Sequence, residues 1–338
     1  MKEKRFYDEQ KDNHIKWRET NIFSKENGWQ NGKSYSHIIP KKIWTENLWK
    51  DIRTILPEYL KNNGVKEHSG VHNLLSSWIV CANVYFPIKY NEQLKSLFAK
   101  FLKSKVSDAI VEISDIQLEF AFEEHSDLHP SKLLGEQNGN RGSGQTSPDI
   151  AFIVKTQSGK NGIVLCENKY TEHSFYSCSA RKIDEKSERV NNPDPQRCMV
   201  AADICNYKDV CHQFVWGRKY LNLINFSDYS KGVLKRCPAA TAGYQLLRQQ
   251  ALAEGIANSN EYEFVASTVA FDKRNTTLIR CLESTGVSDF QSEWSNLFNG
   301  KALFKTWTHQ EWIQFVRDNQ KENEFEEWLN YLKTRYEY

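Results

Sequence analysis

The sequence contains no apolar run of the roughly 20 residues that a membrane-spanning helix needs. The nearest candidate, residues 77–88, is interrupted by Asn83 and Pro87. Cysteine, with 8 residues in 338, is too scarce for a disulfide scaffold, and 16 glycines with 8 prolines exclude a collagenous or low-complexity chain. Residues 1–13 are polar and lack the apolar segment of a secretory signal. We therefore expect a globular cytoplasmic protein that does not contact membranes.

Charged residues make up 26% of the chain, but their signs are unevenly distributed. Residues 1–66 and 181–236 are net basic, whereas 67–180 and 237–338 are net acidic, and the overall charge is only +2. Basic segments attract phosphates, and carboxylates gathered in one region can hold a divalent cation. The pattern suits a metal-dependent nuclease, although segment charges of this size also arise by chance.

The period of the apolar residues changes from about 3.6 to 2 and back along the chain, which predicts an α/β fold. Helices are expected at 70–87, 91–105, 210–225 and 241–255, and strands at 110–122, 147–154, 162–169 and 263–271. Two or three Trp-rich helices follow to the C-terminus. We divide the chain into a basic N-terminal helical extension (1–66), a core (67–275) with a Cys-rich insertion (178–211), and a C-terminal helical region (276–338).

The chemically informative stretch is residues 146–170, which contains two short strands joined by the turn SGKNG. Alternate residues of a strand share a face, so Glu167 and Lys169 project together while Asn168 projects to the other side. The turn folds the chain back and can bring Asp149 beside Glu167. Two carboxylates on paired strands can share one Mg²⁺ or Mn²⁺. Lys169 can then orient or help to deprotonate the water that attacks a phosphodiester.

This arrangement resembles the PD-(D/E)xK nuclease superfamily, whose fold is called restriction-endonuclease-like. Pro148 and Asp149 match the PD half of the motif, and Glu167, Asn168 and Lys169 match the ExK half. The resemblance covers about half of the chain and extends to a bacterial group of restriction-endonuclease-like proteins. It implies a core of a helix, a three-stranded meander, a helix and a further strand, with helical additions at both ends.

The resemblance also implies further site residues. Members of the superfamily commonly complete the metal site with an acidic residue upstream of PD, where Glu119 fits best and Glu112 and Glu123 are rivals. Many members place a glutamine on the helix that follows ExK, and Gln213 matches that position loosely. The catalytic set implied is therefore Asp149, Glu167, Lys169, Glu119 and Gln213, with the three acids as ligands of Mg²⁺.

The function implied is a Mg²⁺-dependent DNA endonuclease that acts in restriction or another defence against foreign DNA. A homodimer is expected, because one active site per chain must cut two strands. A DNA-repair nuclease and a non-cleaving nucleic-acid-binding protein of the same fold are the alternatives. A third reading is an exposed β-hairpin that carries these charges by chance.

Four of the cysteines fall within 34 residues, namely Cys178, Cys198, Cys205 and Cys211. Their spacing lacks the close CxxC pairs of common zinc ribbons, but four thiolates can hold Zn²⁺ or an iron–sulfur cluster. The alternative is a group of unbound thiols packed into the fold.

If these four cysteines hold a structural metal, protein purified anaerobically without chelator contains about one zinc per chain, or iron in a brown protein. Elemental analysis measures this directly. Replacing any of the four by Ser should release the metal and destabilise the fold, whereas Cys81→Ser should release none. A colourless, metal-free and fully stable protein would contradict this prediction.

Overall fold

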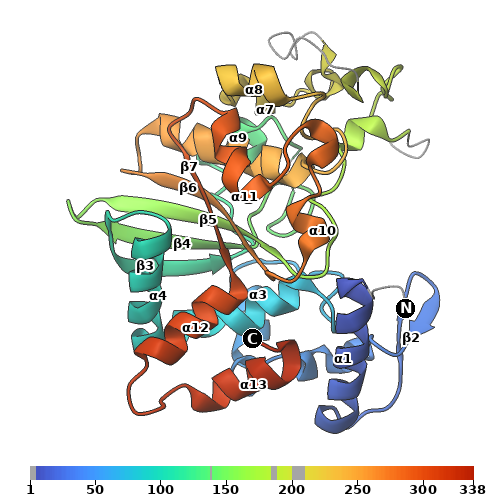
Figure 1. Ribbon diagram of the computed structural model, residues 1–338, viewed down its shortest axis with the longest axis vertical. Coiled ribbons are helices and arrows are strands. Elements are labelled where there is room, and N and C mark those ends of the chain that lie inside the picture. Colours follow the sequence, from blue (N-terminus) through green and yellow to red (C-terminus); the bar gives the residue numbers. More distant parts are fainter. Residues whose placement is uncertain (1–4, 138, 184–188, 200–209) are drawn as a thin grey trace.

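A five-stranded mixed sheet forms the centre of the molecule (Figure 1). The computed structural model describes residues 5–137, 139–183, 189–199 and 210–338. The strand order is β3-β4-β5-β6-β7, with an antiparallel meander of β3, β4 and β5 followed by β6 and β7 parallel to β5. The strands are β3 (Ile110–Leu118), β4 (Ile150–Thr156), β5 (Asn161–Lys169), β6 (Val265–Phe271) and β7 (Leu303–Thr308). The α/β class predicted from the sequence is confirmed.

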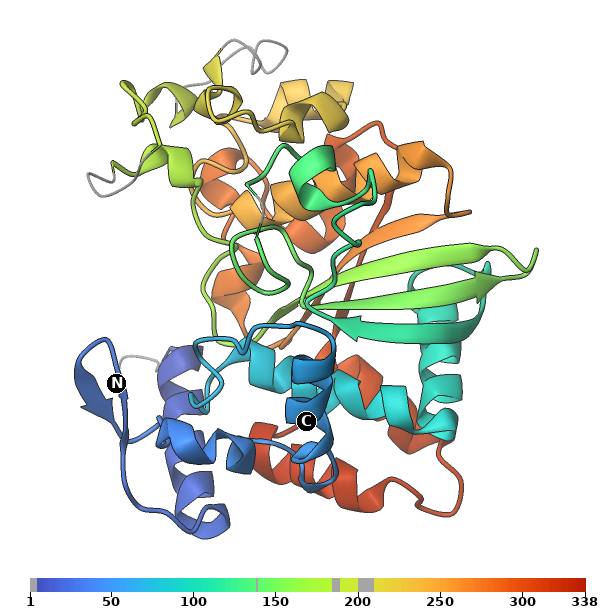
Figure 2. The same ribbon diagram turned by 180° about the vertical axis from the view of Figure 1, so that it is seen from behind.

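Helices cover both faces of this sheet (Figures 1 and 2). On one face lie α3 (Ser77–Tyr85), α4 (Glu92–Lys105), α12 (His309–Asn319) and α13 (Glu326–Tyr336). On the other lie α7 (Tyr220–Leu223), α8 (Asp228–Val233), α9 (Tyr244–Ser259) and α11 (Phe290–Glu293). The other α-helices of the described residues are α1 (Phe6–Asn21), α2 (Ile55–Asn62), α5 (Pro130–Leu133) and α10 (Thr276–Ile279). Within the described residues, no helix is long and apolar enough to cross a membrane.

Strand β5 is buried on both faces, so its side chains contribute alternately to two cores. Val164 and Cys166 belong to the core on the side of α3 and α4. Ile163 and Leu165 belong to the core on the side of α9. The burial of both faces excludes an exposed β-hairpin. Because alternate residues share a face, Glu167 and Lys169 project toward α9, as Ile163 and Leu165 do.

Most predicted elements are present, with shifted ends. The helix expected at 91–105 is α4. The Asn91 side chain caps it by accepting a hydrogen bond from the backbone N–H of Leu94 at 2.8 Å. The buried helix expected over 70–87 begins only at Ser77. The first strand ends at Leu118 rather than at 122, because Glu119 adopts a positive φ of 46° that breaks the extended backbone.

Three predictions about secondary structure were wrong or incomplete. Residues 210–225 do not form one helix, because Gly217, with φ of 72°, separates the 3₁₀ turn His212–Phe214 from α7. The C-terminal region is not wholly helical, since it contributes strand β7 to the sheet. The N-terminal extension likewise contains a small hairpin, β1 (Gly28–Gln30) and β2 (Lys33–Tyr35).

The N-terminal and C-terminal segments meet around a buried arginine. Arg335, on α13, is 1% exposed, and its Nη1 donates to the backbone carbonyl of Asn47 and to the hydroxyl of Tyr331, both at 2.6 Å. Its Nη2 donates to the Asn47 side chain, and the guanidinium lies 4.5 Å from the ring centre of Trp17. Amide, hydroxyl and aromatic groups thus stabilise this cation.

Replacing Arg335 by Met should lower the free energy of unfolding by about 3 kcal/mol, because the buried Asn47 groups lose their donor. Chemical denaturation measures the change. Arg280→Ala is the control, since Arg280 is largely exposed and pairs with Glu283 one helical turn away, so it should change stability by no more than about 0.5 kcal/mol. Equal effects of the two variants would show that the buried contacts of Arg335 contribute little.

Candidate active site

The acidic residues of the motif meet at one edge of the sheet because of the meander. Strand β3 ends, β4 begins and β5 ends at this edge, since Ile150 pairs with both Leu118 and Cys166. Glu119 follows β3 directly, Asp149 precedes β4 directly, and Glu167 lies one residue beyond the pair of Ile150. The structure therefore brings together Glu119, Asp149 and Glu167, as the sequence predicted.

The ExK half of the motif has the predicted alternation. Lys169 Nζ donates to Glu167 Oε1 at 2.6 Å, and these residues are 3% and 7% exposed. Asn168 projects to the opposite face, where its Nδ2 donates to the backbone carbonyl of Ser77 at 2.6 Å. Its backbone N–H donates to Asp149 Oδ2 at 2.6 Å, which ties the two halves of the motif together.

Glu119 is held at this edge by contacts on both sides. Its N–H donates to the carbonyl of Asp149 at 2.9 Å, and Arg141 Nε donates to its carbonyl at 3.0 Å. A side chain at Gly142 would place a Cβ 3.1 Å from the carboxyl carbon of Glu119, and Gly142 has φ of 79°. Glycine is therefore required where the loop crosses this carboxylate. The rivals Glu112 and Glu123 are both exposed and lie outside the cavity described next.

The three carboxylates line a cavity of about 190 Å³ between a glycine-rich loop and helix α9. The loop supplies residues 142–148, and α9 supplies three polar side chains. The lining residues are His68, Glu119, Gly142, Ser143, Gly144, Gln145, Thr146, Ser147, Pro148, Asp149, Glu167, Gln245, Arg248 and Gln249. Lys169 reaches this group through its bond to Glu167 and a second bond, at 2.9 Å, to Gln245 Oε1.

The electrostatics of the cavity are those of crowded, buried carboxylates. Burial, and then the charges of Asp149 and Glu167, raise the pKa of Glu119 well above its ordinary value. Burial and Glu167 likewise raise the pKa of Asp149. Burial alone would lower the pKa of Lys169, but the neighbouring carboxylates, led by Glu167, outweigh it and raise the pKa. Lys169 is therefore a cation here, suited to orienting water and stabilising negative charge rather than to accepting a proton.

The donor atoms of this cavity fit a hard divalent cation. Besides the carboxylates, the buried oxygens Gln145 Oε1 and Gln249 Oε1 have no hydrogen-bond partner among the described residues. Oxygen donors of this kind suit Mg²⁺ or Mn²⁺. The described residues hold no group of three His, Cys, Asp or Glu side chains already arranged around one ion position. A cation bound here would reduce the mutual repulsion of the three acids.

Gln213 is not part of the cavity, contrary to the prediction. Its Nε2 donates to Cys178 Sγ and to the hydroxyl of Tyr244, both at 3.1 Å. Gln245 is the glutamine that contacts Lys169, because α9, and not the irregular segment before it, packs along the site.

Sequence reasoning also missed other residues of this cavity. Gln245, Arg248 and Gln249 are spaced by three and four residues on a helix that the sequence predicts, so their shared face was a usable signal. His68 comes from the loop before α3, where its Nδ1 accepts from the N–H of Gly70 at 3.1 Å and its ring stacks on Trp78. No sequence pattern indicated His68.

The cysteine group differs from the predicted set. Cys178 is buried, Cys198 and Cys211 are partly buried, and Cys205 lies outside the described residues. Cys237 joins them, since its N–H donates to the carbonyl of Cys198 at 3.2 Å, and burial and then the nearby Cys211 raise the pKa of its thiol. Among the residues that the structure covers, no cysteines are arranged to hold a metal, so the metal at this cluster stays a prediction.

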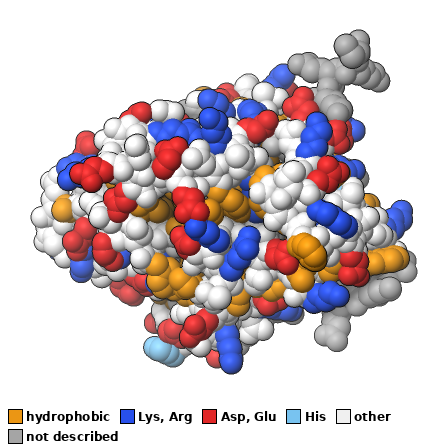
Figure 3. Space-filling view, turned by 90° about the horizontal axis from the view of Figure 1, so that it is seen from below, with side chains coloured by type: hydrophobic (Ala, Val, Ile, Leu, Met, Phe, Trp, Pro, Cys, Tyr) orange, Lys and Arg blue, Asp and Glu red, His pale blue; other side chains and the backbone are white. Residues whose placement is uncertain are grey.

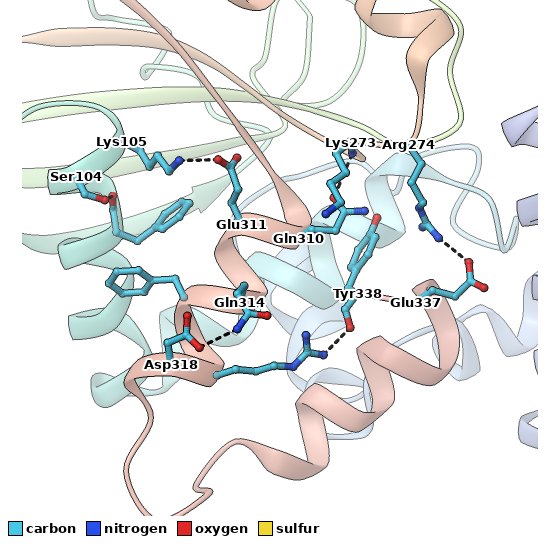
Figure 4. A pocket seen from close by; sticks show the side chains of 13 residues that line it. Ser104, Lys105, Lys273, Arg274, Gln310, Glu311, Gln314, Asp318, Glu337 and Tyr338 are labelled. Carbon is cyan, nitrogen blue, oxygen red and sulfur yellow. Dashed lines mark hydrogen bonds and ion pairs between the residues drawn. The ribbon is translucent and has the colours of Figure 1, made fainter.

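A surface hollow near the C-terminal helices contains none of the predicted site residues. It measures about 530 Å³ and lies between α4 and α12 (Figure 4). Four of its charged groups form two ion pairs, Lys105 with Glu311 and Arg274 with Glu337. The surface seen from below mixes acidic and basic side chains (Figure 3), so that face carries no uniform basic area for DNA.

The comparison with protein families shows what class of protein this is. The family model described as restriction endonuclease associating with ARP matches residues 10–337. The chain therefore belongs to this family, which implies a nuclease that acts on DNA. No curated protein and no solved structure matches the chain.

If Glu119 faces the metal position, Glu119→Gln should weaken Mn²⁺ binding by about tenfold, because one of three ligand charges is lost. The same change should raise the melting temperature of the metal-free protein, since it removes a buried carboxylate that repels its neighbours. Electron paramagnetic resonance and calorimetry measure the two effects.

Glu112→Gln is the matched control for this prediction, because Glu112 is exposed on β3, the strand that Glu119 follows. It should change neither property. If Glu119→Gln still binds Mn²⁺ tightly, and Glu112→Gln or Glu123→Gln loses affinity for Mn²⁺, the third metal ligand is that other acid and not Glu119.

Proposed function

We propose that this protein is a Mg²⁺-dependent DNA endonuclease of the PD-(D/E)xK type and that it acts in defence against foreign DNA. The observation that supports the proposal is the convergence of Asp149, Glu167 and Lys169 with Glu119 at one buried cavity edge. The sheet order, with an antiparallel meander and then a parallel strand after α9, agrees with a restriction-endonuclease-like core. The family adds the expectation of association with ARP.

In this proposal, Asp149, Glu167 and Glu119 hold the cation. When bound, Mg²⁺ neutralises the scissile phosphate and lowers the pKa of a coordinated water. Lys169 orients the attacking water and stabilises the charge that develops on the phosphate as the bond to the leaving oxygen breaks. Gln245 fixes the position of the Lys169 ammonium by accepting a hydrogen bond from it.

Arg248 supplies a second positive charge in the same cavity. Its Nε and Nη2 donate to Thr146 Oγ1 at 2.9 and 2.7 Å, and its Nε lies 3.4 Å from Glu136 Oε1. Glu136 also accepts from the N–H of Thr146 at 2.6 Å, so the loop and α9 are joined through these residues. In our proposal, Arg248 contacts a non-bridging oxygen of the phosphate.

The test is incubation with plasmid and single-stranded DNA in Mg²⁺, Mn²⁺ or EDTA. We expect cleavage only with Mg²⁺ or Mn²⁺, and Asp149→Ala and Lys169→Ala should each reduce its rate by at least about 100-fold, because both residues act on the transition state. DNA binding should be largely retained.

Lys160→Ala is the matched control, because Lys160 is an exposed lysine in the turn at the far end of β4 and β5. The Lys160→Ala variant should cleave DNA at the same rate as the unmodified protein. Undiminished cutting by Lys169→Ala would refute the catalytic assignment. Binding without cutting in all metals would support the non-cleaving alternative, and a strict preference for branched or damaged DNA would support a repair nuclease.

A further inference from the structure

Tyr176 has an unfavourable backbone conformation immediately beside the candidate active site. Its φ is 58°, in the left-handed region that bulky residues seldom adopt. Its side chain is nevertheless 53% exposed, so burial of the ring does not compensate for this conformation. Strained residues of this kind concentrate where a side chain must be presented to a ligand.

The neighbouring backbone holds Tyr176 in this conformation. The N–H of Tyr244 donates to the carbonyl of Tyr176, and the N–H of Gln245 donates to the carbonyl of Phe175, both at 3.0 Å. The N–H of Phe175 donates in turn to the carbonyl of Ala242 at 2.7 Å. The first turn of α9, which supplies Gln245 to Lys169, therefore also positions Tyr176.

The ring of Tyr176 lies over the reactive lysine. Lys169 Nζ is 5.7 Å from the ring centre of Tyr176 and also 5.7 Å from that of Phe175. Phe175 is fully buried and belongs to the core beneath α9. The two adjacent aromatic residues thus differ, since Phe175 packs in the core and Tyr176 presents its ring to solvent next to the ammonium.

We propose that Tyr176 is a substrate-contacting residue that stacks its ring on the base of a nucleotide next to the scissile phosphate. The proposal rests on the proposed function, because it places that phosphate at Lys169. Stacking on an aromatic side chain requires a base outside the helical stack. The substrate at this site is therefore DNA in which one nucleotide near the cut is unstacked.

Two variants separate stacking from a structural role. Tyr176→Gly removes the ring and relieves the strain at φ of 58°, so the melting temperature should stay equal or rise. Its affinity for DNA in Ca²⁺ should fall about tenfold. Tyr176→Phe keeps the ring and should bind within about twofold of the unmodified protein. Tyr229→Ala is the control, because Tyr229 is 41% exposed on α8 and its hydroxyl donates to Glu293, whereas the ring of Tyr176 lies beside Lys169.

Photochemical crosslinking tests the contact directly. DNA that contains 5-iododeoxyuridine at each position in turn is irradiated with the protein in Ca²⁺, and the crosslinked peptide is identified by mass spectrometry. A crosslink on Tyr176, with weak binding by Tyr176→Gly, is the expected result. Crosslinks only to other residues, unchanged binding by Tyr176→Gly, or equal losses in Tyr176→Phe and Tyr176→Gly would each overturn the proposal.

The outcome also distinguishes this inference from the proposed function. A crosslink on Tyr176 in a protein that never cleaves DNA would leave the stacking contact standing and refute the nuclease. Cleavage that depends on Lys169 but not on the Tyr176 ring would leave the nuclease standing and refute the stacking contact. A protein that binds no DNA refutes both.

Discussion

The ion pair between Lys169 and Glu167 lies almost completely out of water, and the surrounding structure compensates for this burial. A buried pair is tolerated only when its remaining hydrogen-bonding positions are also satisfied. Gln245 accepts the second bond of the ammonium, and the rings of Phe175 and Tyr176 face it from nearby. Helix α9, which packs on the sheet through its apolar residues, meets this requirement by supplying Gln245.

The backbone that carries this pair is held by segments distant in the sequence. His309 Nε2 donates to the carbonyl of Lys169 at 3.0 Å, and burial lowers the pKa of His309 to about 4, so its ring is neutral. Asn275 Nδ2 donates to the carbonyl of Tyr170, and the Tyr170 hydroxyl donates to Gln10 at 2.8 Å. The ends of the chain therefore immobilise the end of β5, where a misplacement of the lysine would be costly.

The sequence indicated those parts of the site that depend on local pattern. Strand alternation placed Glu167 and Lys169 together, and the turn placed Asp149 beside them, because both are consequences of short-range geometry. His68 escaped prediction because packing over a long separation brings it to the cavity. Gln245 shares a face of a predicted helix with Arg248 and Gln249, but the sequence does not indicate which part of the sheet that face meets. Strand β7 was not predicted because it has only six residues, among which Lys305 is exposed and Trp307 is buried. It leads directly into the capping box of α12, so the stretch is too short to show an alternating pattern of apolar residues.

The contact of Asn47 with Arg335 has a consequence for how such a protein can be reused in evolution. The sheet residues around the motif would suggest a portable unit flanked by dispensable helices. The bond of Asn47 with Arg335 instead joins the two flanks, and residues 44–60 and 325–338 share one core with α3 and α4. New partners are therefore more easily gained by additions at the surface or the chain ends than by transplanting the central segment into another protein.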